Sequence, residues 1–158
     1  YLSLDPRMKV ADLLKEPFLV QGGRDRGELD GRIKELLRSV ELPDSYIFKF
    51  PRELSGGECQ RVAIARAIST APKLIVCDEP VSSLDAIVQA QILNLLLKLQ
   101  QETNVAYLFI SHDLRVVRHM SDTILVMKEG RVCENGVSEE IFKSPKHPYT
   151  RLLIENLR

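Results

Sequence analysis

The chain has 158 residues, with 22 basic and 22 acidic side chains and a formal net charge of zero. This length is enough for one domain with a modest core, and a hydrophobic share of 44% is ordinary for globular proteins. The balanced charge gives no support to a large basic surface for nucleic acid, and no apolar run reaches the ~20 residues of a membrane span. We therefore expect any membrane association to go through a partner protein.

The first third of the chain is predicted to be helical. A short helix over residues 9–15 should stop near Pro17, because proline interrupts helical hydrogen bonding. A glycine-containing loop is expected over residues 21–27. Apolar residues then recur at helical spacing over residues 29–40, and Pro43 ends that second helix.

The rest of the chain alternates helices and strands. In chain order we expect a helix from residue 57, a strand over 73–77, a helix over 85–102, a strand over 105–110, a helix over 113–120, a hairpin of strands over 123–127 and 131–134, and helices over 138–142 and 148–157. The first two strands are short and wholly apolar, which is typical of strands buried on both faces of a parallel sheet. This order predicts an α/β fold with parallel pairing.

A Ser-Gly-Gly turn at Ser55, Gly56 and Gly57 opens the first helix of this second part. Glycine permits close backbone approach and unusual dihedrals, and a helix start offers free N–H groups at the positive end of the helix dipole. Such a turn suits a nucleotide phosphate. An alternative is that the glycines serve only the geometry of a loop-to-helix junction. The motif is not limited to the turn but continues through Gln60 and Arg61, and this length favours the phosphate interpretation.

Two carboxylates, Asp78 and Glu79, end the first apolar strand. Ligands of open α/β sheets bind at the carboxyl ends of the strands, where one carboxylate can hold Mg²⁺. Because side chains alternate along an extended segment, we expect Glu79 to point elsewhere and to activate water. The alternative is a pair of exposed acids that merely end the strand.

Two further sites follow. Ser83 and Asp85 precede the long helix, where Asp85 is well placed as an N-cap in addition to any functional role. His112 follows the second apolar strand, where it can donate a hydrogen bond to a phosphate oxygen while a neighbour holds its other nitrogen. His119 and His147 have no such context, and we interpret both as solvated or structural.

In this order the motifs resemble those of the ATP-binding-cassette (ABC) ATPases, and the resemblance covers the entire chain. Residues 54–60 resemble the signature motif, 74–79 the Walker B strand, 83–85 the D-loop, and His112 the switch histidine. The resemblance implies an ATPase that uses ATP and Mg²⁺. It implies nucleotide contacts from Ser55, Gly56, Gly57, Glu58, Gln60, Ser83 and Asp85, a magnesium ligand in Asp78, and catalytic roles for Glu79 and His112.

Residues 3–8, 50–53 and 143–150 are similar to segments of importers for oligopeptides, dipeptides and nickel. This similarity implies uptake of peptides, or else of nickel or other small solutes, through transmembrane permease subunits. The implied partners are a second ABC ATPase subunit, identical or different, and indirectly an extracytoplasmic solute-binding protein, with no nucleic acid. The expected location is peripheral, at the cytoplasmic face of the cell membrane.

The sequence departs from the family pattern in three ways. It contains no G-x-x-x-x-G-K-[ST] loop, the Q-loop glutamine would lie before Tyr1, and Glu58 replaces the more frequent glutamine. We therefore expect a C-terminal fragment that is inactive alone. It should comprise a helical subdomain over residues 1–72 that ends in the signature helix, the second half of a RecA-like, mostly parallel P-loop NTPase core over 73–137, and a C-terminal helical extension over 138–158.

Two other functions compete with an importer subunit. One is a soluble, non-transport ABC ATPase that acts on ribosomes or DNA, although no coiled-coil insertion or basic linker is present. The other is a short, non-catalytic interaction module, which would have no need of both Glu79 and His112.

Overall fold

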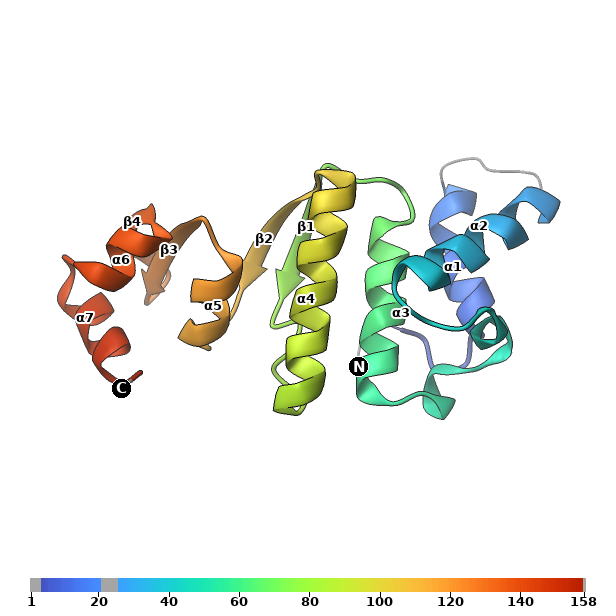
Figure 1. Ribbon diagram of the computed structural model, residues 1–158, viewed down its shortest axis with the longest axis horizontal. Helices are drawn as coiled ribbons and strands as arrows, with labels where there is room; N and C mark the ends of the chain where they lie inside the picture. Colours follow the sequence, from blue (N-terminus) through green and yellow to red (C-terminus); the bar gives the residue numbers. More distant parts are fainter. Residues whose placement is uncertain (1–3, 21–25, 158) are drawn as a thin grey trace. The chain divides into compact units, whose positions relative to one another are not determined.

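The computed structural model describes residues 4–20 and 26–157, and it confirms an α/β fold with parallel strands (Figure 1). Its elements are α1 (Val10–Val20), α2 (Arg26–Ser39), the 3₁₀ turns η1 (Asp44–Phe48) and η2 (Pro51–Glu53), α3 (Gly56–Ile68), β1 (Leu74–Asp78), α4 (Ala86–Thr103), β2 (Ala106–Ile110), α5 (Leu114–Met120), β3 (Thr123–Lys128), β4 (Arg131–Val137), α6 (Ser138–Lys143) and α7 (Pro148–Glu155). None of these described helices combines the length and the apolar character that crossing a membrane requires.

The chain divides into two compact units. The first unit contains the described residues of Tyr1–Ile75 and Val81–Tyr107, and the second contains Val76–Pro80 and the described residues of Leu108–Arg158. The division of the sequence into residues 1–72, 73–137 and 138–158 stays a prediction. The loop expected over residues 21–27 overlaps the start of α2, and its residues 21–25 lie outside the described part.

Helix α1 continues through Pro17, so the expectation that this proline stops the helix is wrong. Proline removes one N–H from the helical ladder, but the helix compensates through its buried face. That face consists of Val10, Leu13, Leu14 and Phe18, all at most 5% exposed. Tertiary burial therefore outweighs the local penalty of the proline.

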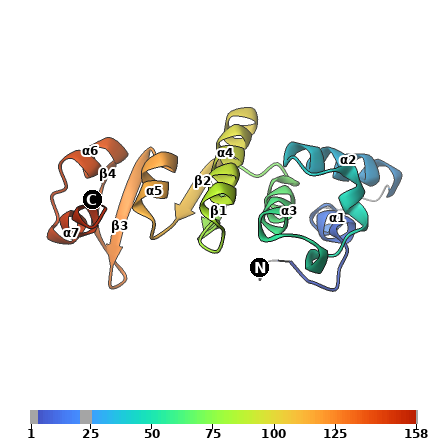
Figure 2. The ribbon, with the colours of Figure 1, turned by 60° about the horizontal axis from the view of Figure 1, so that its bottom comes forward.

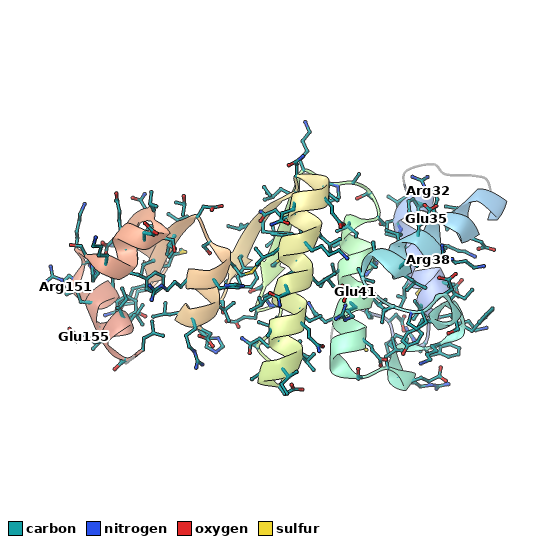
Figure 3. The ribbon with its side chains drawn as sticks, viewed as in Figure 1. Arg32, Glu35, Arg38, Glu41, Arg151 and Glu155 are labelled. Carbon is teal, nitrogen blue, oxygen red and sulfur yellow. The ribbon has the colours of Figure 1, made fainter. Side chains whose placement is uncertain are left out.

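Helix α2 buries one face and exposes charges on the other. Leu29, Ile33, Leu37 and Val40 belong to the core. Figure 3 shows Arg32, Glu35 and Arg38 following one another along the helix at intervals of three, which places them on one exposed side. Arg38 donates two hydrogen bonds to Asp44 of η1, at 2.9 and 2.5 Å. This pairing attaches the helix to the connector that leads toward α3.

Helices α3 and α4 lie side by side in both views (Figures 1 and 2). Val62 of α3 and Ile92 and Leu96 of α4 are nearly inaccessible to solvent. Asp85 caps the start of α4, as the sequence predicts, and Asn104 ends the helix in the left-handed conformation with φ 54°. The first unit therefore has a helical core.

Strands β1 and β2 pair in parallel, which confirms the predicted pairing. The amide of Ala106 donates to the carbonyl of Lys73 at 2.9 Å, and the amide of Glu79 donates to the carbonyl of Ile110 at 3.0 Å. The first residues of β1 therefore pair with the first residues of β2, and the last residues of β1 pair with the last residues of β2. The carboxyl end of β1 consequently lies beside that of β2.

Strands β3 and β4 form the predicted hairpin. Its two-residue turn has φ 50° at Glu129 and φ 74° at Gly130, and two consecutive positive values are typical of hairpin turns. On one side of the hairpin, Ile124 and Val126 pack with Ile141 of α6 in the core of the second unit. The hairpin therefore positions the C-terminal helices.

Strands β1 and β3 have only one buried side each, and on β2 Leu108 and Ile110 are each 46% exposed, so the expectation that β1 and β2 are buried on both faces is wrong. Cys77 of β1 is buried, which raises the pKa of its thiol to about 11. The alternate side chains Leu74 and Val76 are 55% and 57% exposed, and on β3 Leu125 and Met127 are 55% and 58% exposed. No described residue covers these alternate positions.

Candidate functional site

The residues that the sequence singles out fall into one group in each compact unit. The first unit holds Ser55, Gly56, Gly57, Glu58, Gln60, Ser83 and Asp85. The second unit holds Asp78, Glu79 and His112. Each group is described by itself.

Ser55 is the N-cap of α3 in a reciprocal capping box. Its Oγ accepts a hydrogen bond from the Glu58 amide at 3.3 Å, and Glu58 Oε2 accepts one from the Ser55 amide at 2.7 Å. Two amide groups at the helix start are satisfied in this way. Ser55 itself stays exposed, so its hydroxyl hydrogen can still reach a ligand.

Tyr46 is a participant that the sequence did not reveal. Its hydroxyl donates to Glu58 Oε1 at 2.5 Å across twelve residues. The hydrogen bonds from Tyr46 and from the Ser55 amide hold the pKa of Glu58 below its ordinary value of 4.5. The aromatic connector before α3 was the available signal, but spacing alone does not reveal which ring reaches the turn. The Glu58 carboxylate is thus engaged within the protein.

Gly56 and Gly57 are the first two residues of α3, so they adopt helical backbone angles. Among the described glycines, a positive φ occurs at Gly130 and not in this turn. Gly57 is needed for close approach instead: a β-carbon there would stand 2.5 Å from Cγ1 of Val88. Gln60 lies four residues after Gly56 and therefore on the same side of the helix, where it is half-buried.

The starts of α3 and α4 lie next to each other, as Figure 1 shows at the lower ends of both helices. Asp85 Oδ1 accepts hydrogen bonds from the amides of Ile87 at 3.1 Å and Val88 at 3.0 Å. Val88 is the residue that faces Gly57, and Ser83 lies exposed in the turn before the cap. Two helix N-termini with their positive dipole ends therefore lie close together, and each already has a carboxylate of the protein beside it, Glu58 at α3 and Asp85 at α4.

Asp78 and Glu79 differ in backbone conformation, which the sequence did not show. Asp78 is the last residue of β1 and is exposed. Glu79 has φ 47°, a left-handed conformation that is uncommon for a residue with a side chain. The alternation expected of an extended strand therefore does not apply at Glu79. The hydrogen bond from the Glu79 amide to Ile110 fixes the turn.

The structure brings His112 to Glu79. The imidazole Nδ1 lies 2.7 Å from Glu79 Oε1, and the two side chains are 77% and 36% exposed. The hydrogen bond and the negative charge of Glu79 raise the pKa of His112 above its ordinary value of 6.5. Engagement of Nδ1 by the carboxylate leaves Nε2 to face a ligand. This is the arrangement expected from the sequence, in which a neighbour holds one ring nitrogen.

The described residues contain no group of three or more histidine, cysteine, aspartate or glutamate side chains arranged to hold a metal ion. Asp78 nevertheless fits Mg²⁺, which is bound through one or two carboxylates together with substrate phosphates and water. An exposed carboxylate at the end of a parallel strand provides one such ligand.

Comparisons with known proteins identify the family to which the chain is similar. A family model described as ABC transporter matches residues 2–82. The chain is 46% identical over 154 residues to the di/tripeptide transport ATP-binding protein DppF of Pseudomonas aeruginosa, and 46% identical over 153 residues to the oligopeptide transport ATP-binding protein OppF of Escherichia coli. These matches cover 98% and 96% of the chain but only 48% and 46% of the relatives. The chain thus spans about half the length of the curated relatives it matches.

A solved structure, the dimeric post-hydrolysis state of the ATP-binding cassette MJ0796 bound to ADP and Pi, is also similar. Its TM-score is 0.73 at 31% sequence identity, and the match covers 85% of this chain and 59% of that one. The fold of the described residues is therefore that of part of an ATP-binding cassette.

Proposed function

This chain belongs to the ABC transporter family, and we propose that it is part of the ATP-binding and ATP-hydrolysing subunit of an importer for di- and oligopeptides. The names of the relatives, which are peptide transport ATP-binding proteins, support this substrate class. Nickel and other small solutes are the second choice. ATP hydrolysis, cargo and partners are properties of a whole protein about twice this length, so each is part of the proposal.

The contact between Glu79 and His112 is the observation that carries this function. Glu79 is the general base that takes a proton from the attacking water, and His112 donates from Nε2 to a phosphate oxygen. The raised pKa of His112 favours the protonated ring, which can donate from both nitrogens. Asp78 would hold Mg²⁺, which when bound neutralises charge on the phosphates.

The Ser55 turn serves the same reaction from the facing subunit. Ser55, Gly56 and Gly57 offer donors at a helix start, and Ser83 and Asp85 lie at the neighbouring helix start. Donors without a phosphate-binding lysine suit a surface that closes over nucleotide already held elsewhere. We propose that two cassettes, identical or different, sandwich ATP in this way, and that hydrolysis separates them. The dimeric state of the similar cassette supports this arrangement.

The proposed setting is a peripheral one. Closure of the cassettes would drive a membrane permease, with the ATPase at the cytoplasmic face and a solute-binding protein that delivers cargo on the other side.

ATP hydrolysis is tested with the protein expressed from its natural reading frame. Glu79→Gln should lower the rate by about 10²-fold or more, because it removes the base, while ATP binding persists. Glu129→Gln is the matched control, since that glutamate lies in the β3–β4 turn. An unchanged rate in Glu79→Gln contradicts the assigned base.

Transport is tested in cells that produce the protein together with its permease. Uptake of a labelled dipeptide should require intact Glu79, and the protein should co-purify with permease subunits. Co-purification with ribosomes or DNA, without uptake, would instead establish a non-transport ABC ATPase. Uptake of nickel but not of peptide would replace the cargo and keep the mechanism.

A further inference from the structure

The Ser55 turn is tied to the helical region by a hydrogen bond that no motif describes. We propose that Tyr46 is a positioning residue for this turn: its hydroxyl orients the Glu58 carboxylate, which in turn fixes Ser55 at the start of α3. This inference rests on the proposed function, because it assigns Tyr46 a role in placing Ser55 against nucleotide. Tyr46 itself touches no reacting atom.

The two oxygens of Glu58 are engaged by different segments of the chain. Oε1 accepts from the Tyr46 hydroxyl at 2.5 Å, and Oε2 accepts from the Ser55 amide at 2.7 Å. A carboxylate held at both oxygens cannot rotate about its terminal bond without losing one partner. The carboxylate therefore holds the Ser55 amide, while the Glu58 backbone amide donates to Ser55 Oγ.

Lys49 makes the Tyr46 hydroxyl a stronger hydrogen-bond donor. Its Nζ lies 3.7 Å from the centroid of the Tyr46 ring, where the cation attracts the electrons of the ring face. Withdrawal of electron density from the ring makes the hydroxyl a better donor to a carboxylate. The positive charge of Lys49 also contributes, as a smaller cause after the hydrogen bonds, to the lowered pKa of Glu58.

Tyr46 is itself fixed by the helices that precede the turn. It lies in η1, which packs against α1 and α2. The Lys49 carbonyl accepts from the Val10 amide at 2.9 Å, and Arg38 of α2 pairs with Asp44 at the start of η1. The Tyr46 hydroxyl therefore links α1 and α2 to the Ser55 turn, in addition to the direct packing of both helices on α3. Nothing else in the capping box reaches outside α3 among the described residues.

The chemistry also accounts for a carboxylate at position 58. Glutamate accepts at both oxygens, as this arrangement requires, whereas glutamine accepts at one oxygen and donates from its nitrogen. With glutamine, the Ser55 amide could keep its acceptor only if the side-chain nitrogen turned to Tyr46, whose hydroxyl would then accept a hydrogen bond instead of donating one. Tyr46 and Glu58 are therefore a matched pair, and each should depend on the other.

The test uses the protein expressed from its natural reading frame, with ATP as the probe. Tyr46→Phe removes only the hydroxyl, and we expect ATP hydrolysis and ATP-dependent association of cassettes to fall roughly 3- to 10-fold. Nucleotide affinity of the separated subunit should stay unchanged, because the turn acts on the facing subunit's nucleotide. Tyr107→Phe is the matched control: it removes a similar half-buried hydroxyl, which donates to the Leu96 carbonyl at 3.0 Å.

A double-mutant cycle separates positioning from packing. In a Glu58→Ala background, Tyr46→Phe should have no further effect on ATP hydrolysis, because its acceptor is gone. The pKa of Glu58 should rise in Tyr46→Phe, because the hydrogen bond that lowers it is removed, and NMR titration of the carboxylate checks this. A purely structural tyrosine would give equal losses of ATP hydrolysis in both backgrounds.

Two failures have different signatures. If the wild-type protein hydrolyses ATP but Tyr46→Phe behaves like Tyr107→Phe, the positioning role is wrong and the proposed function stands. If the wild-type protein neither hydrolyses ATP nor associates in its presence, the proposed function is wrong. In that case, an unchanged melting temperature in Tyr46→Phe would also show that the hydroxyl does not hold the turn.

Discussion

Gly57 of α3 faces Val88 of α4 so closely that a β-carbon at position 57 would stand 2.5 Å from the valine Cγ1. Real β-carbons do not approach other atoms this closely, and a valine in a helix has little rotamer freedom to move away. Gly57 therefore sets the distance between the two helix starts that carry Ser55 and Asp85.

The first prediction concerns this contact. Gly57→Ala should lower the free energy of unfolding by about 1–3 kcal/mol, because one of the two helices must shift. Gly31→Ala is the matched control: Gly31 lies in α2, where an added β-carbon would meet no atom within 4 Å, and this variant should gain up to about 1 kcal/mol. Urea unfolding measures both.

Shortening the Val88 side chain tests whether a steric clash causes this loss of stability. The double variant Gly57→Ala, Val88→Ala should recover part of the stability that Gly57→Ala loses relative to Val88→Ala alone. A Gly57→Ala protein as stable as the wild type would contradict the steric explanation.

The second prediction concerns pH. The Glu79 partner raises the pKa of His112, so the favourable pairing is fully present below the ordinary value of 6.5 and is lost as pH rises through the higher folded value. In an NMR titration of the imidazole signals, Glu79→Gln should move the His112 midpoint to lower pH. Glu129→Gln is the control, because that glutamate lies in the β3–β4 turn, and it should leave the His112 midpoint unchanged. If the midpoint of His112 is the same in Glu79→Gln as in the wild type, the pair of His112 and Glu79 does not form in solution.

The third prediction concerns the cap of α4. Asp85→Ala should lower the free energy of unfolding by about 0.5–2 kcal/mol, because the amides of Ile87 and Val88 lose their acceptor. Asp85→Asn keeps an acceptor oxygen and should retain most of the stability. Thermal unfolding distinguishes them, and an asparagine variant as unstable as the alanine variant would mean that charge, not capping, matters here.

The fourth prediction concerns the C-terminal segment. The carboxylate of Glu134 on β4 accepts from the amides of Lys146 at 2.8 Å and His147 at 3.0 Å. His147 Nδ1 in turn accepts from the Tyr149 amide and caps α7, which confirms its structural interpretation. Glu134→Ala should speed hydrogen exchange at the Lys146 and His147 amides by about tenfold, because charged hydrogen bonds are lost.

The amides within β3 provide the reference for this measurement, since their partners are on β4 main chain and are untouched. Exchange that accelerates equally in β3 would indicate general destabilisation, and unchanged exchange at Lys146 and His147 would contradict the role assigned to Glu134.

Much of the fold could be predicted from the spacing of apolar residues and from the residues that favour turns. The apolar runs predicted both parallel strands, and Lys128 to Arg131 predicted the hairpin turn, because these signals are local. Pro17 misled the prediction of α1, since the burial of Leu13 and Phe18 is a tertiary effect that outweighs a missing hydrogen bond. The open side of β1 was also unpredictable, because a wholly apolar run does not show which face is covered.

The order of amino acids was enough to predict the candidate site residues other than Tyr46 and the chemistry proposed for them. Glycines, carboxylates and a histidine at these spacings are properties of the covalent chain. The contacts that hold these residues depend on the folded structure. Nδ1 of His112 lies at Glu79, Gly57 packs against Val88, and the Tyr46 hydroxyl donates to Glu58. Such contacts join residues 12 to 33 positions apart, and they depend on packing and backbone angles that no local pattern encodes.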